Sequence, residues 1–292
     1  LRGTSDSGRD IDIPAVTDEN GVAIFSEIPI GTYTIYEDEK TVPTAYLVAD
    51  PQNVTVTYAE TKEVPIENKE KTGSITVHKT TEGQKNIEGI KFYLRGTSDS
   101  GRAIDIPATT DKDGIAKFDG VPIGTYMVIE DEETVPYGYL VADEKEVKVE
   151  YAQTIDETIL NNEQTGTVKV HKKTADMTNV EGIRFILSGI SDTGREIRIE
   201  ATTDKDGLAK FEGVPVGTYT ITEDGSTVPY GYLVADSKQV TVAYAQTVDT
   251  DMVNEKAPDT PNTGVTDNDS DGSKALCSVA IILAGAAIVM FS

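Results

Sequence analysis

Hydrophobic and polar residues alternate along most of the chain in short blocks, and turn-forming residues separate these blocks. In "SITVHK" at 74–79, Ile75, Val77 and Lys79 occupy alternate positions and would share one face of an extended strand. Blocks of this kind end at polar runs such as "DKDG", which is typical of a turn and predicts a β-hairpin there. No block has helical periodicity. The pattern predicts an all-β protein with turns at the spacing of a β-sandwich.

Seven or so short strands are expected in one unit of this pattern. After "SITVHK" the alternating or apolar blocks are "IKFYLRG", "AIDIPATT", "IAKFDGV", "PIGTYMVIE", "GYLVA", "KEVKVEYA" and "IDETILN". A Pro-containing loop precedes "GYLVA".

The unit occurs three times. "LRGTSDSGR" begins at Leu1 and at Leu94, and it returns as "LSGISDTGR" at Leu187, with the same offset of 93 residues between successive copies. An unbroken register over three copies indicates a tandem array of domains. We expect a truncated first sandwich that lacks its first strand, two complete sandwiches, a disordered linker and a hydrophobic segment, at residues 1–70, 71–163, 164–256, 257–274 and 275–292.

Composition narrows the functional classes. The 292 residues carry a formal net charge of −24, which argues against a nucleic-acid partner. The single cysteine, Cys277, excludes a disulfide framework, and we interpret it as an inert thiol within the apolar tail. His78 and His171 alternate with inward-facing positions, so both should face solvent. We expect no metal, no cofactor and no enzyme activity apart from the single self-crosslinking reaction considered next.

Three polar residues extend apolar strand faces. Lys79 follows Ile75 and Val77, Glu130 continues the stripe that contains Val128, and Asn161 lies two residues after an isoleucine. The third copy repeats the set as Lys172, Glu223 and Asn254, and the first copy retains Glu37 and Asn68, with its lysine position before residue 1.

An amine, a carboxyl group and a carboxamide on inward faces suggest a reaction. Burial lowers the pKa of a lysine, and a neutral amine is a nucleophile. A protonated carboxyl group can polarise an amide carbonyl and relay protons. The product would be an amide between the Lys79 and Asn161 side chains, with ammonia released. The alternative is that Lys79 extends its amine to solvent at the end of a strand.

These features resemble the Cna protein B-type (SpaA-like, prealbumin-like) domains of Gram-positive surface proteins and pilins. The resemblance rests on "ITVHKT", "FDGVPIGTYMVIEDEETVPYGYLV" and "ILNN". It implies tandem prealbumin-like or Ig-like sandwiches with intramolecular isopeptide bonds. The implied bonds join Lys79 to Asn161 and Lys172 to Asn254, and Glu130 and Glu223 are the implied promoting acids. The loop "EDEETVPYGY" is two residues longer before its proline than the family pattern.

The tail has a different composition. "EKAPDTPNTGVTDNDSDGSK" at 255–274 is typical of a disordered linker, and the 18 uncharged residues that follow are predicted to span a membrane transiently. "TPNTG" resembles the cell-wall sorting signal that sortases read, although the family's leucine is replaced and no terminal Lys or Arg residues follow. Its residues are Thr260, Pro261, Asn262, Thr263 and Gly264.

The sequence therefore predicts the structural stalk of an extracellular, cell-wall-anchored surface protein, and we regard it as part of a longer protein. Its partners would be a sortase and an amine from a peptidoglycan precursor or another pilin subunit. A host or matrix ligand would bind an upstream head. The alternative is that the copies themselves are adhesin repeats that contact host or matrix molecules, in which case loss of one copy would reduce avidity steeply.

Overall fold

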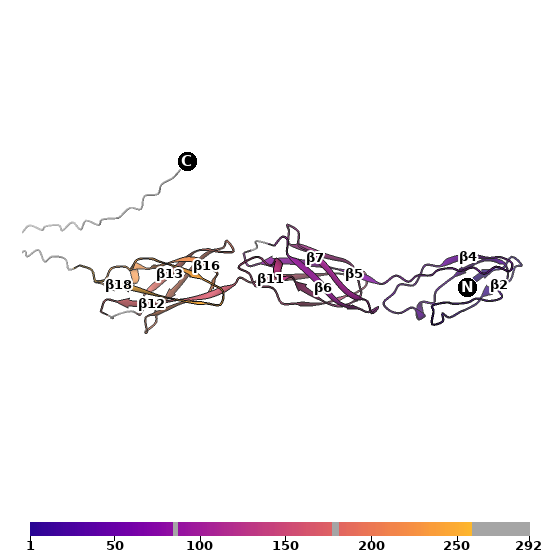
Figure 1. Ribbon diagram of the computed structural model, residues 1–292, viewed down its shortest axis with the longest axis horizontal. Coiled ribbons are helices and arrows are strands. Elements are labelled where there is room, and N and C mark those ends of the chain that lie inside the picture. The colour runs from indigo at the N-terminus through magenta and orange to yellow at the C-terminus, as the bar shows by residue number, and fades with distance from the viewer. Residues whose placement is uncertain (84–86, 177–180, 259–292) are drawn as a thin grey trace, which may run out of the picture. The chain divides into compact units, whose positions relative to one another are not determined.

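A computed structural model describes residues 1–83, 87–176 and 181–258 (Figure 1). The described residues contain strands, turns and three short 3-10 helices, so the predicted all-β class is confirmed. The second copy has the seven strands β5 (Thr72–Thr81), β6 (Lys91–Ser98), β7 (Ala103–Thr109), β8 (Ile115–Pro122), β9 (Gly124–Glu130), β10 (Lys145–Val149) and β11 (Thr154–Asn161), with helix η2 (Glu132–Thr134).

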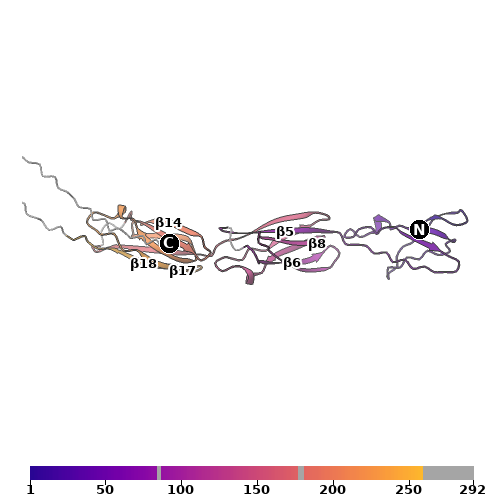
Figure 2. The ribbon, with the colours of Figure 1, turned by 90° about the horizontal axis from the view of Figure 1, so that it is seen from above.

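Two sheets form the sandwich of the second copy. One has the order β11-β5-β8 and the other the order β10-β9-β6-β7. The first strand of the copy, β5, pairs in parallel with the last strand, β11, and antiparallel with β8. Figure 2 shows β5 beside β8. The inward-facing residues of both sheets form one core, which includes Ile75, Val77, Phe92, Leu94, Phe118, Tyr126 and Val128.

The third copy repeats this topology. Its sheets have the orders β15-β12-β18 and β14-β13-β16-β17. Its elements are β12 (Thr165–Thr174), β13 (Arg184–Ser191), β14 (Glu196–Thr202), β15 (Leu208–Pro215), β16 (Gly217–Glu223), η3 (Gly225–Thr227), β17 (Lys238–Val242) and β18 (Thr247–Asn254).

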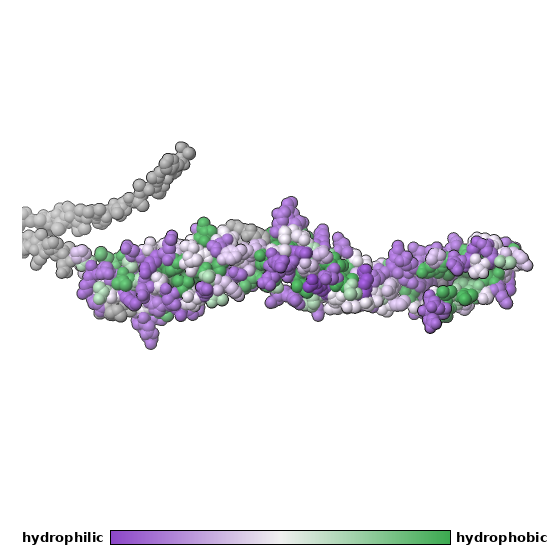
Figure 3. Space-filling model, in the orientation of Figure 1, coloured by the Kyte–Doolittle hydropathy of each residue, from purple (hydrophilic) through white to green (hydrophobic). Residues whose placement is uncertain are grey.

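Residues 1–70 form one four-stranded sheet, with the order β2-β1-β3-β4, so only one of the two sheets expected for the first copy is present there. In the complete copies β5 and β12 are the central strands of the three-stranded sheets, and residues 1–70 contain no counterpart of them. The segments 22–29 and 61–68, which correspond to the two flanking strands, are not paired as strands. Ile66 is therefore 40% exposed, whereas its counterpart Ile159 in the second copy is 6% exposed. Figure 3 shows apolar side chains on the surface of this copy. The elements are β1 (Arg2–Thr4), β2 (Asp10–Asp12), β3 (Gly31–Ile35), η1 (Glu39–Thr41) and β4 (Gln52–Val56).

Two local predictions were wrong. "GYLVA" at 138–142 is not a strand, because its backbone groups bond to the chain after the last strand and to a side chain: Leu140 N donates to Asn162 O at 2.9 Å, and Ala142 N donates to Glu130 at 2.8 Å. The turn at "DKDG" is present, and Asp111 Oδ1 accepts from the backbone N–H of Ile115 at 3.0 Å. It joins β7 to β8, which belong to different sheets, so it is not a hairpin turn.

The fold predicts a steric requirement where the first strand of a complete copy begins. A Cβ atom on Gly166 would lie 2.7 Å from the carbonyl oxygen of Ala243 and 2.8 Å from that of Gln246, and neither backbone can move freely. Gly166→Ala should destabilise the third copy by about 1–3 kcal/mol. Hydrogen exchange read by mass spectrometry should show faster exchange in β12 and β18. Thr167→Ala, one residue along, is the control, and equal exchange in the two variants would contradict the close packing.

Candidate functional site

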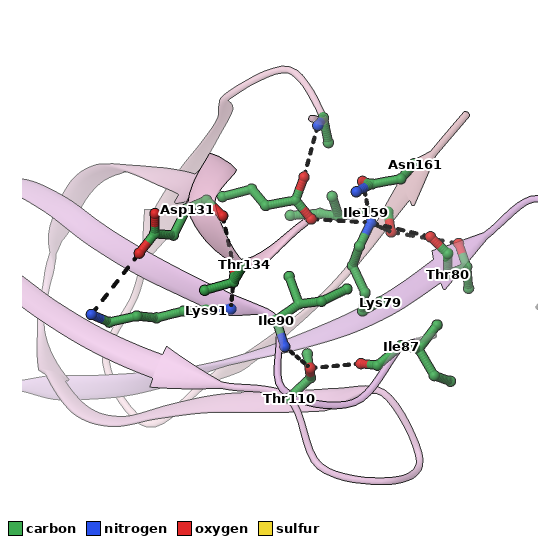
Figure 4. A network of polar contacts seen from close by, with 12 residues as sticks. Lys79, Thr80, Ile87, Ile90, Lys91, Thr110, Asp131, Thr134, Ile159 and Asn161 are labelled. Atoms are coloured by element: carbon green, nitrogen blue, oxygen red, sulfur yellow. Dashed lines mark hydrogen bonds and ion pairs between the residues drawn. The ribbon is translucent and has the colours of Figure 1, made fainter. Parts of the chain in front are cut away.

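Lys79 lies on the inward face of β5, and its side chain has no exposed surface. Its amine is surrounded by oxygen atoms (Figure 4). Nζ donates to the backbone carbonyls of Thr80 and Ile159, both at 3.1 Å, and to Oδ1 of Asn161. Glu130 Oε1 lies 3.3 Å from the same Nζ. The alternative in which the amine reaches solvent is therefore wrong for this structure.

The two sheets each contribute to this site. Lys79 and Asn161 come from the parallel neighbours β5 and β11, in whose register Lys79 is opposite Ile159 and Asn161 is opposite Thr81. Glu130 is the last residue of β9, in the facing sheet, and its side chain is 1% exposed. The acid thus reaches the amine from across the core.

A backbone amide fixes the orientation of the acid. Glu130 Oε2 accepts a hydrogen bond from Ala142 N at 2.8 Å. The other oxygen, Oε1, has no hydrogen-bond partner among the described residues and is the one that lies beside Lys79. The carboxyl group is thereby held with one oxygen available to the amine.

The third copy places its residues in the same way. The Lys172 side chain is fully buried, and its Nζ lies 3.2 Å from Glu223 Oε1. Nζ also donates to the carbonyls of Lys173 and Met252, both at 3.2 Å. Glu223 Oε2 accepts from Ala235 N at 2.7 Å, as its counterpart does in the second copy. The carboxylate and the two backbone carbonyls around the amine are therefore the same in both copies.

The carboxamides of the two copies differ in orientation. Asn254 directs Nδ2 to Glu223 Oε2 at 2.5 Å and to the carbonyl of Leu233 at 2.7 Å. Asn161 instead directs Oδ1 to the amine of Lys79, and its Nδ2 has no hydrogen-bond partner among the described residues. In both copies the side-chain amide contacts a member of the Lys–Glu pair.

Burial shifts the ionisation of the two amines. Desolvation lowers the pKa of Lys79 and of Lys172 below the ordinary 10.5, and the neighbouring glutamates oppose this shift only in part. A larger fraction of each amine is therefore neutral and nucleophilic at a given pH. A neutral amine beside a carboxamide and a carboxyl group can attack the carboxamide carbon and displace its nitrogen as ammonia.

The first copy retains half of the arrangement. Asn68 Nδ2 donates to Glu37 Oε2 at 2.6 Å and to the carbonyl of Leu47 at 2.9 Å. Ala49 N donates to the same carboxylate oxygen at 2.7 Å. The acid and the amide are thus brought together by residues 1–70 alone, which contain no counterpart of Lys79.

The sequence predictions did not identify the backbone groups of the site. The alanine N–H donors come from the recurring "YLVAD" segment, 12 residues after each glutamate, at Ala49, Ala142 and Ala235. Their fixed offset from the glutamate is visible in the sequence. Their role is not, because any residue with an N–H could supply the bond.

The remaining candidate residues lie elsewhere. His78 Nε2 lies 3.0 Å from Asp156 Oδ1 and His171 Nε2 lies 2.8 Å from Asp249 Oδ1, on partly exposed surfaces. No group of metal-ligating side chains was found in the described part of the chain. Among these residues no helix is long and apolar enough to cross a membrane. The motif at 260–264, Cys277 and the segment 275–292 lie outside the described residues.

Comparison with known proteins supports one family. Residues 5–70, 73–164 and 166–256 each match the SpaA family, described as a prealbumin-like fold domain. No curated protein sequence matches the chain.

One solved structure shows the same fold over most of this chain. The Bacillus anthracis TIE protein is 20% identical with a TM-score of 0.58, over 85% of this chain and 45% of that protein, so the chain spans less than half of it. The minor pilin GBS52 of Streptococcus agalactiae is 19% identical over 65% of this chain and 98% of its own, with a TM-score of 0.31. The shaft pilin SpaA from Lactobacillus rhamnosus GG is 16% identical over 65% and 100%, with a TM-score of 0.30.

The lowered pKa of the buried amine predicts how stability depends on pH when no amide can form. In Asn161→Ala the amine of Lys79 stays free, and the native second copy binds fewer protons than the unfolded one between the lowered pKa and 10.5. The free energy of unfolding should therefore rise with pH across this interval and stay level below it. Chemical unfolding at a series of pH values measures this. Lys79→Met combined with Asn161→Ala should lack the rise, and a rise of the same size in both variants would contradict the assignment to Lys79.

Proposed function

We propose, from the premise that the chain belongs to the SpaA family of prealbumin-like fold domains, that each complete copy joins its own first and last strands through an amide bond. The observation that supports this most strongly is the fully buried amine of Lys79, which lies against both Asn161 and Glu130. The contact between the amine and the carboxylate recurs in the third copy with Lys172 and Glu223, and there Asn254 contacts the same glutamate. We take the copies to be residues 1–70, 71–163 and 164–256.

In the proposed reaction Nζ of Lys79 replaces Nδ2 of Asn161 as the nitrogen of the amide. The neutral Nζ of Lys79 attacks Cγ of Asn161, and the new C–N bond forms as the bond from Cγ to Nδ2 breaks. Nζ loses one proton, Nδ2 gains it, and ammonia leaves. The reaction needs no oxidant, reductant or cofactor, because its atoms and charges balance within these side chains.

Glu130 moves the proton in this scheme. Proton transfer from Lys79 to the carboxylate, across the observed 3.3 Å, creates a neutral amine and a neutral acid without a change in net charge. The acid then donates a hydrogen bond to the amide oxygen and increases the positive character of Cγ. The backbone N–H of Ala142 keeps the carboxyl group in position for both steps.

The bond would stabilise a copy against both unfolding and extension. It joins residues that are 82 positions apart. By analogy with a disulfide, closure of such a loop contributes about 4–5 kcal/mol through the entropy of the unfolded chain. A force along the chain would act on the bonded pair of strands β5 and β11, and the segment between the two residues would not extend.

Copies of this kind suit the stalk of a Gram-positive surface protein. The proposal includes extracellular localisation, a sortase that cuts within "TPNTG", and an amine acceptor from a peptidoglycan precursor or a pilin subunit. A transient membrane span at 275–292 would hold the chain for the sortase. The support for these finer points is the order of motif, linker and apolar segment in the sequence, together with family membership.

The amide proposal predicts the mass of the intact protein. The full chain should be lighter than its sequence mass by two molecules of ammonia, one for each complete copy. In Glu130→Gln the mass deficit should fall from two molecules of ammonia to one, because the proton carrier is lost only in the second copy. Intact-mass spectrometry under denaturing conditions measures this.

Glu37→Gln is the matched control for that experiment. This carboxyl group holds the equivalent position in residues 1–70, which contain no counterpart of Lys79, so the mass deficit should remain two ammonia molecules. A wild-type mass equal to the sequence mass would refute the proposed bond. A deficit that Glu130→Gln leaves unchanged would refute the role of the acid.

The sorting proposal predicts a defined C-terminus. A sortase cuts between Thr and Gly of its motif, so protein released from purified cell walls should end at Thr263, linked to a cell-wall amine. Peptide mapping after wall digestion identifies this end. Thr263→Ala should abolish the linkage while Thr266→Ala, in the same linker, should leave it intact. A mature peptide that continues beyond Gly264 would contradict the proposal.

A further inference from the structure

Glu163 is the last residue of the second copy, and it contacts both the second and the third copy. Its backbone forms a β-bridge with Tyr139, and its N–H donates to Glu82 at 2.8 Å, both in the second copy. Its carboxylate accepts hydrogen bonds from the Thr193 hydroxyl and from the Arg195 guanidinium, both in the third copy. The side chain of Glu163 has no exposed surface, whereas Arg195 remains 43% exposed.

The next residue connects the same copies through its main chain. Gln164 N donates to Gly138 O at 2.7 Å in the second copy, and Gln164 O accepts from Val216 N at 2.9 Å in the third. The copies also approach closely at Gly138, where a Cβ atom would lie 2.7 Å from Cγ2 of Thr193. The boundary within the compact unit Leu1–Lys256 is therefore packed as well as hydrogen-bonded.

The same contacts recur 93 residues earlier. Glu70 accepts from the hydroxyl of Ser100 and forms an ion pair with Arg102 at 3.0 Å. The adjacent Lys71 N donates to Ala45 O at 2.8 Å, and Ile123 N donates to Lys71 O at 3.0 Å. The same contacts thus occur at the boundary between the first and second copies and at that between the second and third, although the local sequences differ.

The third copy has the opposite charge at the equivalent position. Residue 256 is a lysine, and it forms an ion pair at 3.3 Å with Asp176 of its own copy. The residues that follow Lys256 do not repeat the unit. Glutamate is therefore present at the two positions that precede another copy, and lysine at the one that precedes the linker.

A buried carboxylate persists only while its donors stay in place. Removal of a partner from a buried ion pair leaves an uncompensated charge, which is strongly destabilising. Domains whose interface is not large and apolar are otherwise expected to move relative to one another. The Glu163 carboxylate can stay paired and out of water only while the third copy keeps its position against the end of the second.

We propose that this contact, formed by Glu163 with Thr193 and Arg195, and by Glu70 with Ser100 and Arg102, is a carboxylate clasp that fixes the orientation of neighbouring copies. The partner that the clasp accepts is another copy with a hydroxyl group and an arginine two residues later. Lys256 cannot enter such a site, because its ammonium group would face an arginine. The clasp is independent of the amide bonds within the copies.

Distance measurements between copies test the clasp. The full chain would carry Cys277→Ser, with spin labels on cysteines introduced at the exposed positions Lys117 and Lys210, one in each complete copy. Pulsed dipolar spectroscopy should give a narrow distance distribution for this parent. Glu163→Gln and Glu163→Lys should broaden it at least about twofold, because the copies return to independent motion.

Variants on the other side of the boundary make the test decisive. Arg195→Gln removes a half-exposed donor and changes no residue of the second copy. It should broaden the distance distribution as Glu163→Gln does. Glu200→Gln removes an equally charged but exposed carboxylate of the third copy and should leave the width unchanged. An unchanged width in both Glu163→Lys and Arg195→Gln would overturn the proposal, as would equal broadening by Glu200→Gln.

Discussion

An amine buried between two apolar sheets is the constraint on which the architecture of each complete copy depends. A lone ammonium group in such a core would be very costly, so the surrounding chain must supply oxygen atoms or remove the charge. Both complete copies supply carbonyls from the strand that carries the lysine and from its parallel neighbour, and a carboxylate from the facing sheet. Conversion of the amine to an amide would remove the charge altogether.

The order of the strands follows from this requirement. The parallel pairing of the first and last strands brings the amine beside the carboxamide, although they are 82 positions apart in the sequence. The segment "GYLVA" is not a strand, and the N–H of its alanine donates to the glutamate. Residues 1–70 show that the second sheet depends on its central strand. They contain no counterpart of that strand, and the segments 22–29 and 61–68 form no sheet there.

Much of this could be predicted from alternation and repetition. The alternation in "SITVHK" places Lys79 on the inward face, and the recurrence of the triad after 93 residues makes an accidental placement implausible. Three features could not be predicted in this way. The backbone donor at Ala142 is independent of side-chain identity, the turn at "DKDG" connects two sheets rather than one hairpin, and the contact of Glu163 with Arg195 depends on how one copy meets the next. Local patterns record which face a residue occupies, but long-range contacts depend on the completed fold.

The most direct test of the account is the electron density between Lys79 and Asn161 in a high-resolution crystal structure of the chain. The proposed bond predicts continuous density from Nζ to Cγ at the length of an amide bond, about 1.33 Å, with a planar group and no density for Nδ2. The same should hold between Lys172 and Asn254. Separate side chains at hydrogen-bonding distance, with the carboxamide nitrogen still present, would contradict it.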